Sequence, residues 1–106
     1  MNAHVFLQTD EMLLSQLTGL FELFDGTQTI SFGHLCLTNK RLYLCSAKPI
    51  NLQQSLWFKG EHKEIIADTL IVGTKRMTVK WRYRGNWEHF TEIFYQLSFM
   101  ETGAKR

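Results

Sequence analysis

The stretch GHLCLTNKRLYLCS, residues 33–46, decides the fold that this sequence predicts. Leucines alternate with other residues on both sides of its centre, as in paired strands that share one buried face. These leucines are Leu35, Leu37, Leu42 and Leu44. Between them, Asn39 tolerates the left-handed backbone of a tight hairpin. Pairing Thr38 with Arg41 would place all the leucines on one face, so we expect a hairpin with a leucine core.

Further strands and one helix are expected outside this hairpin. The expected strands cover residues 13–24, 29–38, 41–46, 53–59, 64–67, 68–72 and 77–84. Gly19 lies inside the first of them, where a glycine commonly marks a bulge or bend. Pro49, the single proline, interrupts pairing between the third and fourth strands.

Residues 77–84 show the most regular alternation in the chain. Met77, Val79, Trp81 and Tyr83 alternate with Thr78, Lys80, Arg82 and Arg84. We therefore expect Val79 and Trp81 to be buried with the leucines of the hairpin. The opposite face would then carry Lys80, Arg82 and Arg84 as a basic outer surface.

A change of period follows this strand and predicts a helix over residues 87–100. Its apolar stripe consists of Trp87, Phe90, Phe94 and Leu97. Asn86 is the expected N-cap, and Gly103 is the expected stop. Such a stripe could bind a hydrophobic partner, but helical spacing favours a face that covers the core.

The hairpin stretch resembles the signature of GRAM domains, which reads roughly Gly-x-Leu-x-Leu-Thr-Asn-x-Arg-Leu. The matching residues are Gly33, Leu35, Leu37, Thr38, Asn39, Arg41 and Leu42. GLUE domains of endosomal-sorting subunits are similar and add flanking motifs. Their opening, middle and closing motifs resemble residues 11–14, 23–26, and 81–85 with 88–90. The resemblance covers about residues 11–100 and implies the pleckstrin-homology superfold shared by both families.

We therefore expect a mainly β fold with one C-terminal α-helix: a seven-stranded, PH-like bent sandwich or barrel, capped by the amphipathic helix. The domain should cover residues 11–102, after a loosely ordered arm at residues 1–10. With 106 residues, 44% of them hydrophobic, the chain can bury one core but is too short for two ordinary domains. Neither a transmembrane segment nor a secretory signal is evident, so we expect a cytoplasmic protein.

No catalytic or metal-binding motif emerges from the sequence. The four histidines are dispersed, and Cys36 and Cys45 lack the spacing of a zinc site, so we expect free thiols. A phosphate-binding loop, a nucleophile elbow and a carboxylate pair are also missing. The net charge of +2 is too small to argue for nucleic acid. We expect a protein that is not an enzyme and needs no cofactor or metal.

A lipid site is expected where three loops meet. Because successive antiparallel strands alternate in direction, residues 25–28, 47–51 and 73–76 should emerge at one end. That end would gather Lys48, Lys75 and Arg76, where pleckstrin-homology domains often bind phosphoinositide headgroups. Lys80, Arg82 and Arg84 form a second candidate surface. Scattered surface charge is the alternative, since a single exposed charge contributes little. Lys40 and Arg41 could contact an anionic surface, but we favour solubilising or packing roles in the turn.

These features predict a peripheral membrane adaptor that binds acidic phospholipid and takes part in membrane trafficking. The resemblance to GLUE domains leaves a second hypothesis, a protein-interaction module that binds ubiquitin or a sorting-complex subunit. A third is a small domain or enzyme subunit without a lipid role. Salt should weaken lipid binding more than binding at a packed protein interface.

Overall fold

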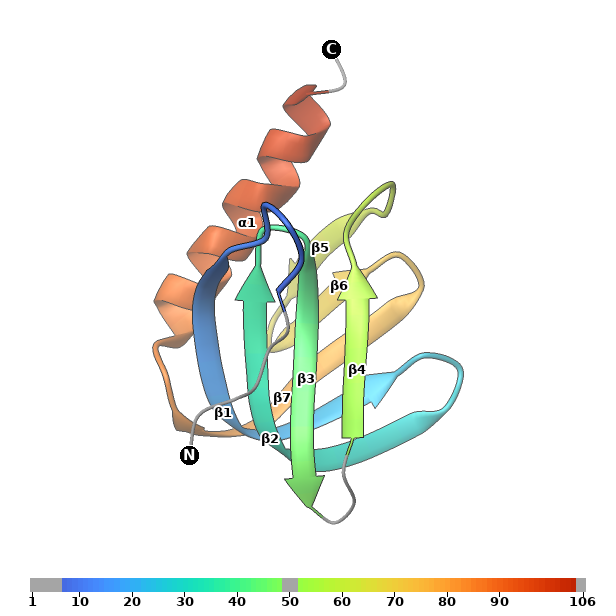
Figure 1. Cartoon of the computed structure of the whole chain (residues 1–106). Helices are drawn as coiled ribbons and strands as arrows, with labels where there is room; N and C mark the ends of the chain where they lie inside the picture. The colour runs from blue at the N-terminus through green and yellow to red at the C-terminus, as the bar shows by residue number, and fades with distance from the viewer. Residues whose placement is uncertain (1–6, 49–51, 105–106) are drawn as a thin grey trace.

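The computed structural model describes the backbone of residues 7–48 and 52–104, and the side chains of residues 7–46 and 53–98. Seven strands precede one helix: β1 (Leu13–Phe24), β2 (Gln28–Thr38), β3 (Arg41–Lys48), β4 (Leu52–Trp57), β5 (Lys63–Ile66), β6 (Thr69–Val72), β7 (Lys75–Arg84) and α1 (Trp87–Ala104). They form one antiparallel sheet in the order β4-β3-β2-β1-β7-β6-β5. The sheet curves around the core, and α1 covers one opening (Figure 1). The predicted fold class is confirmed.

The hairpin of β2 and β3 has the predicted register. Leu35 lies opposite Leu44 and Leu37 opposite Leu42, and all these side chains are fully buried. The Thr38 hydroxyl accepts hydrogen bonds from the backbone N–H groups of Lys40 and Arg41 and so closes the turn. Local alternation therefore predicted the register, but the left-handed backbone expected at Asn39 is not present, since Asn39 has no positive φ.

Two glycines face each other where β1 and β2 bend. Gly19 pairs with Gly33, and the pairing of β1 with β7 and of β2 with β3 shifts beside them. A Cβ on Gly19 would collide with the carbonyl oxygen of Trp81, and one on Gly33 with that of Cys45. Only glycine allows neighbouring backbones to approach so closely. The bend expected at Gly19 is present, and it turns the far halves of β1 and β2 across the molecule (Figure 1).

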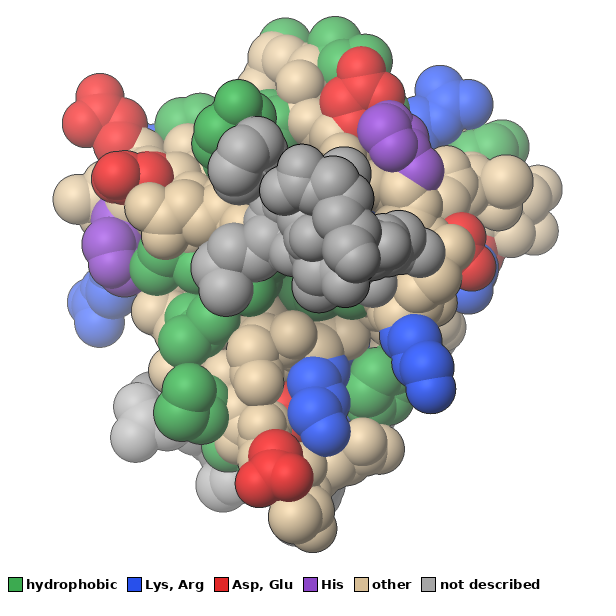
Figure 2. All heavy atoms as spheres, turned by 90° about the horizontal axis from the view of Figure 1, so that it is seen from above, with side chains coloured by type: hydrophobic (Ala, Val, Ile, Leu, Met, Phe, Trp, Pro, Cys, Tyr) green, Lys and Arg blue, Asp and Glu red, His purple; other side chains and the backbone are tan. Residues whose placement is uncertain are grey.

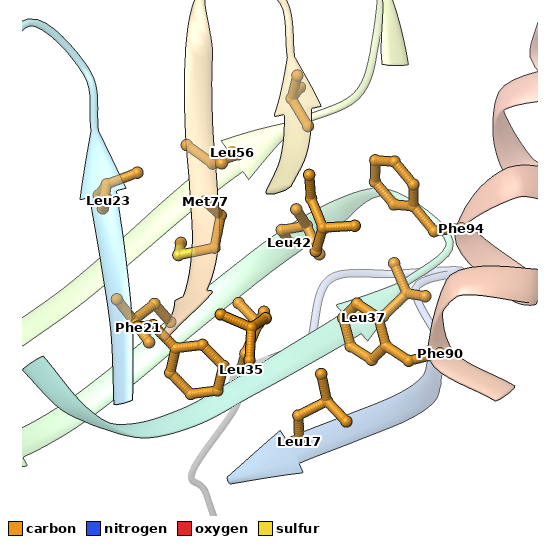
Figure 3. Packing of buried hydrophobic residues seen from close by; sticks show 14 of the residues in the cluster. Leu17, Phe21, Leu23, Leu35, Leu37, Leu42, Leu56, Met77, Phe90 and Phe94 are labelled. Carbon is orange, nitrogen blue, oxygen red and sulfur yellow. The ribbon is translucent and has the colours of Figure 1, made fainter. Parts of the chain in front are cut away.

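The core lies between the curved sheet and the inner face of α1. Phe90 and Phe94 are fully buried and point from the helix toward Leu37 and Leu42 of the hairpin (Figure 3). Asn86 caps the helix, because its Oδ1 accepts a hydrogen bond of 2.9 Å from the backbone N–H of His89. The predicted core face of the helix is confirmed, but α1 continues past the expected stop at Gly103 to Ala104.

Two expectations for β7 are wrong. Met77 and Val79 are buried as predicted, but Trp81 is 54% exposed and Tyr83 60% exposed. Phe21 pairs with Val79 while Leu20 pairs with Trp81, so Lys80 is an extra residue in β7. This bulge shifts the alternation by one and turns Trp81 to the outer face. The strand therefore does not present a core face and a basic face along its whole length.

Candidate binding surface

Lys75 and Arg76, the described members of the predicted loop site, lie at different places. Lys75 lines a hollow with Trp57 of β4 and with Glu61. Arg76 lines another hollow with Glu22 and Phe24. Adjacent residues of a strand point to opposite faces, which separates the two cations.

Lys48, the third member, lies outside the residues whose side chains are described. Its backbone pairs with Phe32, at the end of β3 opposite Arg41. Arg41 in turn pairs with Trp57, which borders the hollow of Lys75. Strand geometry therefore places the backbone of Lys48 and the hollow of Lys75 at opposite ends of β3 and β4.

An exposed apolar surface covers the outer side of β1, β2 and β7, and we call it the outer face. Glu22 pairs with Ile30, Leu20 pairs with both Phe32 and Trp81, and paired residues share one face of a sheet. The large exposed hydrophobic side chains of the outer face are Phe24, Ile30, Phe32, Trp81 and Tyr83, which are 40–60% exposed. Such a group in one place on a small domain commonly marks an interaction site.

Three aromatic rings of the outer face touch one another. The ring centroids of Phe32 and Trp81 are 6.1 Å apart, those of Phe32 and Tyr83 are 6.4 Å apart, and those of Trp81 and Tyr83 are 5.8 Å apart. All three pairs are tilted rather than stacked, within the range of favourable aromatic contacts. We call Phe32, Trp81 and Tyr83 the aromatic cluster.

Cations border these apolar side chains. The Arg76 guanidinium lies 5.4 Å from the ring centroid of Phe24, and that of Arg84 lies 5.7 Å from the ring centroid of Tyr83. Lys80 Nζ lies 3.6 Å from Glu22 Oε1. Of the described residues of β1, β2 and β7, Glu22 is the only acidic one. The outer face therefore combines apolar area with excess positive charge.

Arg82 does not lie with the other residues of the predicted basic surface. It is exposed, but it lines a hollow with residues 85–88, where α1 begins. The structure thus groups Arg76 from the predicted loop site with Lys80 and Arg84 from the predicted strand site, and it leaves Arg82 beside the helix.

The expectations from the sequence did not include the apolar residues of the outer face, although the spacing of apolar residues in one strand indicates them. In residues 29–38, large apolar side chains occupy positions 30 and 32 and then positions 35 and 37. The alternation changes phase at Gly33, which is where the strand bends. A strand with such a change carries apolar side chains on both faces.

Arg41 has a structural role, unlike the cations of the outer face. Its Nε donates a hydrogen bond of 2.8 Å to Glu11 Oε2, and its guanidinium lies 4.7 Å from the ring centroid of Tyr43 and 4.5 Å from that of Trp57. Burial raises the pKa of Glu11, but hydrogen bonds from Arg41, the backbone of Gln8 and other donors outweigh it and hold the pKa below its ordinary value. Arg41 is thus a packing residue of the turn.

At the end of the molecule that carries the hairpin turn, the described side chains carry charges of both signs (Figure 2). Seen from above, Lys, Arg, Asp and Glu side chains are interspersed among hydrophobic and polar atoms (Figure 2). Lys40 donates a hydrogen bond of 2.9 Å to the backbone oxygen of Thr9. Neighbouring charges of opposite sign weaken attraction to an anionic surface.

The reactive side chains among the described residues do not form a metal or nucleophile site. No group of three or more His, Cys, Asp or Glu residues is placed to hold a metal ion in the described part of the chain. Cys36 and Cys45 are free, and burial raises the pKa of Cys36 to about 12, so its thiol stays protonated. Ser15 Oγ lies 3.2 Å from His89 Nδ1, but this exposed contact joins the helix to β1.

Comparison of this chain with protein-family models, with curated proteins and with solved structures finds no match. The resemblance to GRAM and GLUE domains therefore stays a prediction from the motifs. Among the described residues, α1 lacks the apolar character that a membrane-crossing helix needs.

Proposed function

We propose that this chain is a non-enzymatic module that associates with the surface of membranes rich in acidic phospholipid. The observation that carries the proposal is the outer face, where exposed apolar side chains lie beside Arg76, Lys80 and Arg84. Acidic lipids attract basic residues held near the surface, each contributing about 1 kcal/mol. Apolar area beside these cations gains further free energy on leaving water.

The outer face supports this function better than the predicted loop site does. Arg76, Lys80 and Arg84 extend along one strand on the face that also holds the apolar side chains, so a flat surface could contact them together. Lys75 lies at a different hollow and would contribute separately. A peripheral adaptor that acts in the cytoplasm is the cellular role that fits this proposal.

A charge-matched pair of variants tests the proposal. Replacing Arg76 and Arg84 by Ala should lower the affinity for phosphatidylserine vesicles by about thirtyfold at low salt, because two surface cations contribute about 2 kcal/mol. Replacing Lys59 and Lys75, exposed cations away from the outer face, removes the same charge and should change affinity much less. Equal losses would show that net charge, not this surface, governs binding. Absence of any binding to acidic vesicles at low salt would refute the function.

The second candidate is a protein-interaction module, for which ubiquitin or a sorting-complex subunit is the partner suggested by the resemblance to GLUE domains. Ile30 and Phe24 favour it, because they are 48% and 40% exposed and a protein partner could bury them. Added salt separates the two functions, since it screens attraction to acidic lipid but weakens an apolar interface little.

A further inference from the structure

The aromatic cluster has an unusual position on the fold. Phe32 directly precedes Gly33, and the carbonyl of Trp81 packs against Gly19, so the cluster lies at the bend of the sheet. Since the core fills the inner side of the bend, the outer face is convex there. Side chains on a convex ridge reach a flat surface before the rest of the domain does.

The bulge at Lys80 places the ring of Trp81 on this ridge. Regular alternation after Val79 would point Trp81 into the core, but the extra residue turns it outward to meet Phe32 and Tyr83. Bulges commonly redirect side chains at functional places. The result is three exposed rings in contact, of which Trp and Tyr combine an apolar body with a polar group.

We propose that Phe32, Trp81 and Tyr83 insert into the boundary between lipid headgroups and acyl chains, while Arg84 and Arg76 remain at the level of the lipid phosphates. The inference rests on the proposed function and specifies the layer of the membrane that each side chain occupies. Trp and Tyr favour this boundary because their polar groups stay hydrated while the ring leaves water. The Arg84 guanidinium lies 5.7 Å from the ring centroid of Tyr83, close enough to reach headgroup phosphates around an inserted ring.

Charge complementarity identifies a lipid surface, rather than a second copy of this chain, as the occupant. A symmetric dimer across the outer face would bring Arg76, Lys80 and Arg84 of both copies together against one glutamate from each. An acidic bilayer pairs the same cations with phosphate and carboxylate groups. It also accepts the exposed rings without requiring a matching shape.

Quenching of tryptophan fluorescence by brominated lipids tests the insertion directly. The 106-residue chain is mixed with vesicles of phosphatidylcholine and phosphatidylserine whose acyl chains carry bromine either near the glycerol end or near the methyl end. We expect stronger quenching by the shallow bromine. Trp81→Phe should abolish the difference, whereas Trp57→Phe, which alters a tryptophan on β4, should preserve it.

A matched pair of variants measures the contribution of the cluster to binding. Phe32→Ser with Trp81→Ser should lower partitioning into the acidic vesicles by about thirtyfold, because the exposed part of two rings no longer leaves water. Met12→Ser with Tyr95→Ser removes side chains that are 59% and 66% exposed elsewhere and should leave partitioning within about twofold. Circular dichroism and thermal unfolding confirm that each variant is folded.

The outcomes separate this inference from the proposed function. Binding to acidic vesicles without quenching at Trp81 would overturn insertion and leave acidic-lipid recognition standing. Equal quenching with purely phosphatidylcholine vesicles would support insertion and overturn the requirement for acidic lipid. Binding to neither kind of vesicle, with self-association in sedimentation that Trp81→Ser abolishes, would overturn both and assign the cluster to a protein interface.

Discussion

Glu11 and Arg41, thirty residues apart in the chain, form a buried ion pair in which Arg41 Nε donates a hydrogen bond of 2.8 Å to Glu11 Oε2. The same carboxylate oxygen accepts a hydrogen bond of 2.7 Å from the Thr38 hydroxyl, and the other oxygen accepts one of 2.8 Å from the backbone N–H of Gln8. The pair joins the segment before β1 to the hairpin turn. It links two of the motifs that carry the resemblance to GRAM and GLUE domains.

Removing one partner of this pair should lower the free energy of unfolding more than removing both. Arg41→Met should lower the free energy of unfolding by about 3 kcal/mol, because it leaves the Glu11 carboxylate buried without its cation. Adding Glu11→Gln should restore part of that loss and so give a double-mutant cycle that is not additive. Urea unfolding measures the stability of the wild-type protein, the two single variants and the double variant. Additive losses would mean that the two side chains stabilise the fold independently.

The stability of the wild-type protein should depend on the ionisation of Glu11 in acid. Because the folded state holds the pKa of Glu11 below its ordinary value, ionised Glu11 stabilises the fold above that ordinary value. This stabilisation should disappear as the pH falls through the lower, folded pKa. Urea unfolding between about pH 6 and pH 2 should show the loss, and Glu11→Gln should show a smaller one. The same slope in both proteins would assign the acid sensitivity to other carboxyl groups.

The leucine hairpin should be the most sensitive part of the core. Leu37 is fully buried between β2, β3 and the helix, so Leu37→Ala should lower the free energy of unfolding by about 2–5 kcal/mol. Leu13→Ala removes the same atoms from a side chain that is 46% exposed and should cost well under 2 kcal/mol. Thermal and urea unfolding measure both. Equal costs would argue that the hairpin is not at the centre of the core.

The bend should require glycine at position 19. A methyl group on Gly19 meets the carbonyl oxygen of Trp81, so Gly19→Ala must separate β1 from β7 and should cost about 1–3 kcal/mol. A methyl group on Gly33 would meet the carbonyl oxygen of Cys45, so Gly33→Ala should lower the stability by a similar amount. Urea unfolding measures the loss, and amide hydrogen exchange should show weaker protection in β7 for Gly19→Ala. Unchanged stability would mean that the bend relaxes without cost.

The helix should be part of the folded domain rather than an appendage. Truncation after Gly85 removes the fully buried Phe90 and Phe94, exposes the leucines beneath them, and should give an aggregating protein that binds hydrophobic dyes. Phe94→Ala is a milder change than the truncation and should lower the free energy of unfolding by about 3–5 kcal/mol. Tyr95→Ala, at a side chain that is 66% exposed, is its control. A soluble truncated protein that unfolds cooperatively would show that the sheet is stable alone.

The sequence by itself determined the elements with a regular local pattern. Alternating leucines around Asn39 predicted the hairpin and its register, and the three- and four-residue spacing after Asn86 predicted the buried face of the helix. These signals are local, because the period of a strand or helix appears within a few neighbouring residues.

Only the tertiary structure decided which side chains form the outer face. The bulge at Lys80 depends on the register between β1 and β7, and the pairing of Gly19 with Gly33 joins strands at a bend. The extra residue at Lys80 moved Trp81 from the predicted core to the surface, and a second extra residue, Tyr83, shifts the alternation again. A second register shift separates Arg82 from Arg84, because Arg82 pairs with Gly19 and Arg84 pairs with the adjacent residue Thr18. A one-residue shift between distant strands leaves the local apolar pattern unchanged, and for that reason the candidate site required the fold.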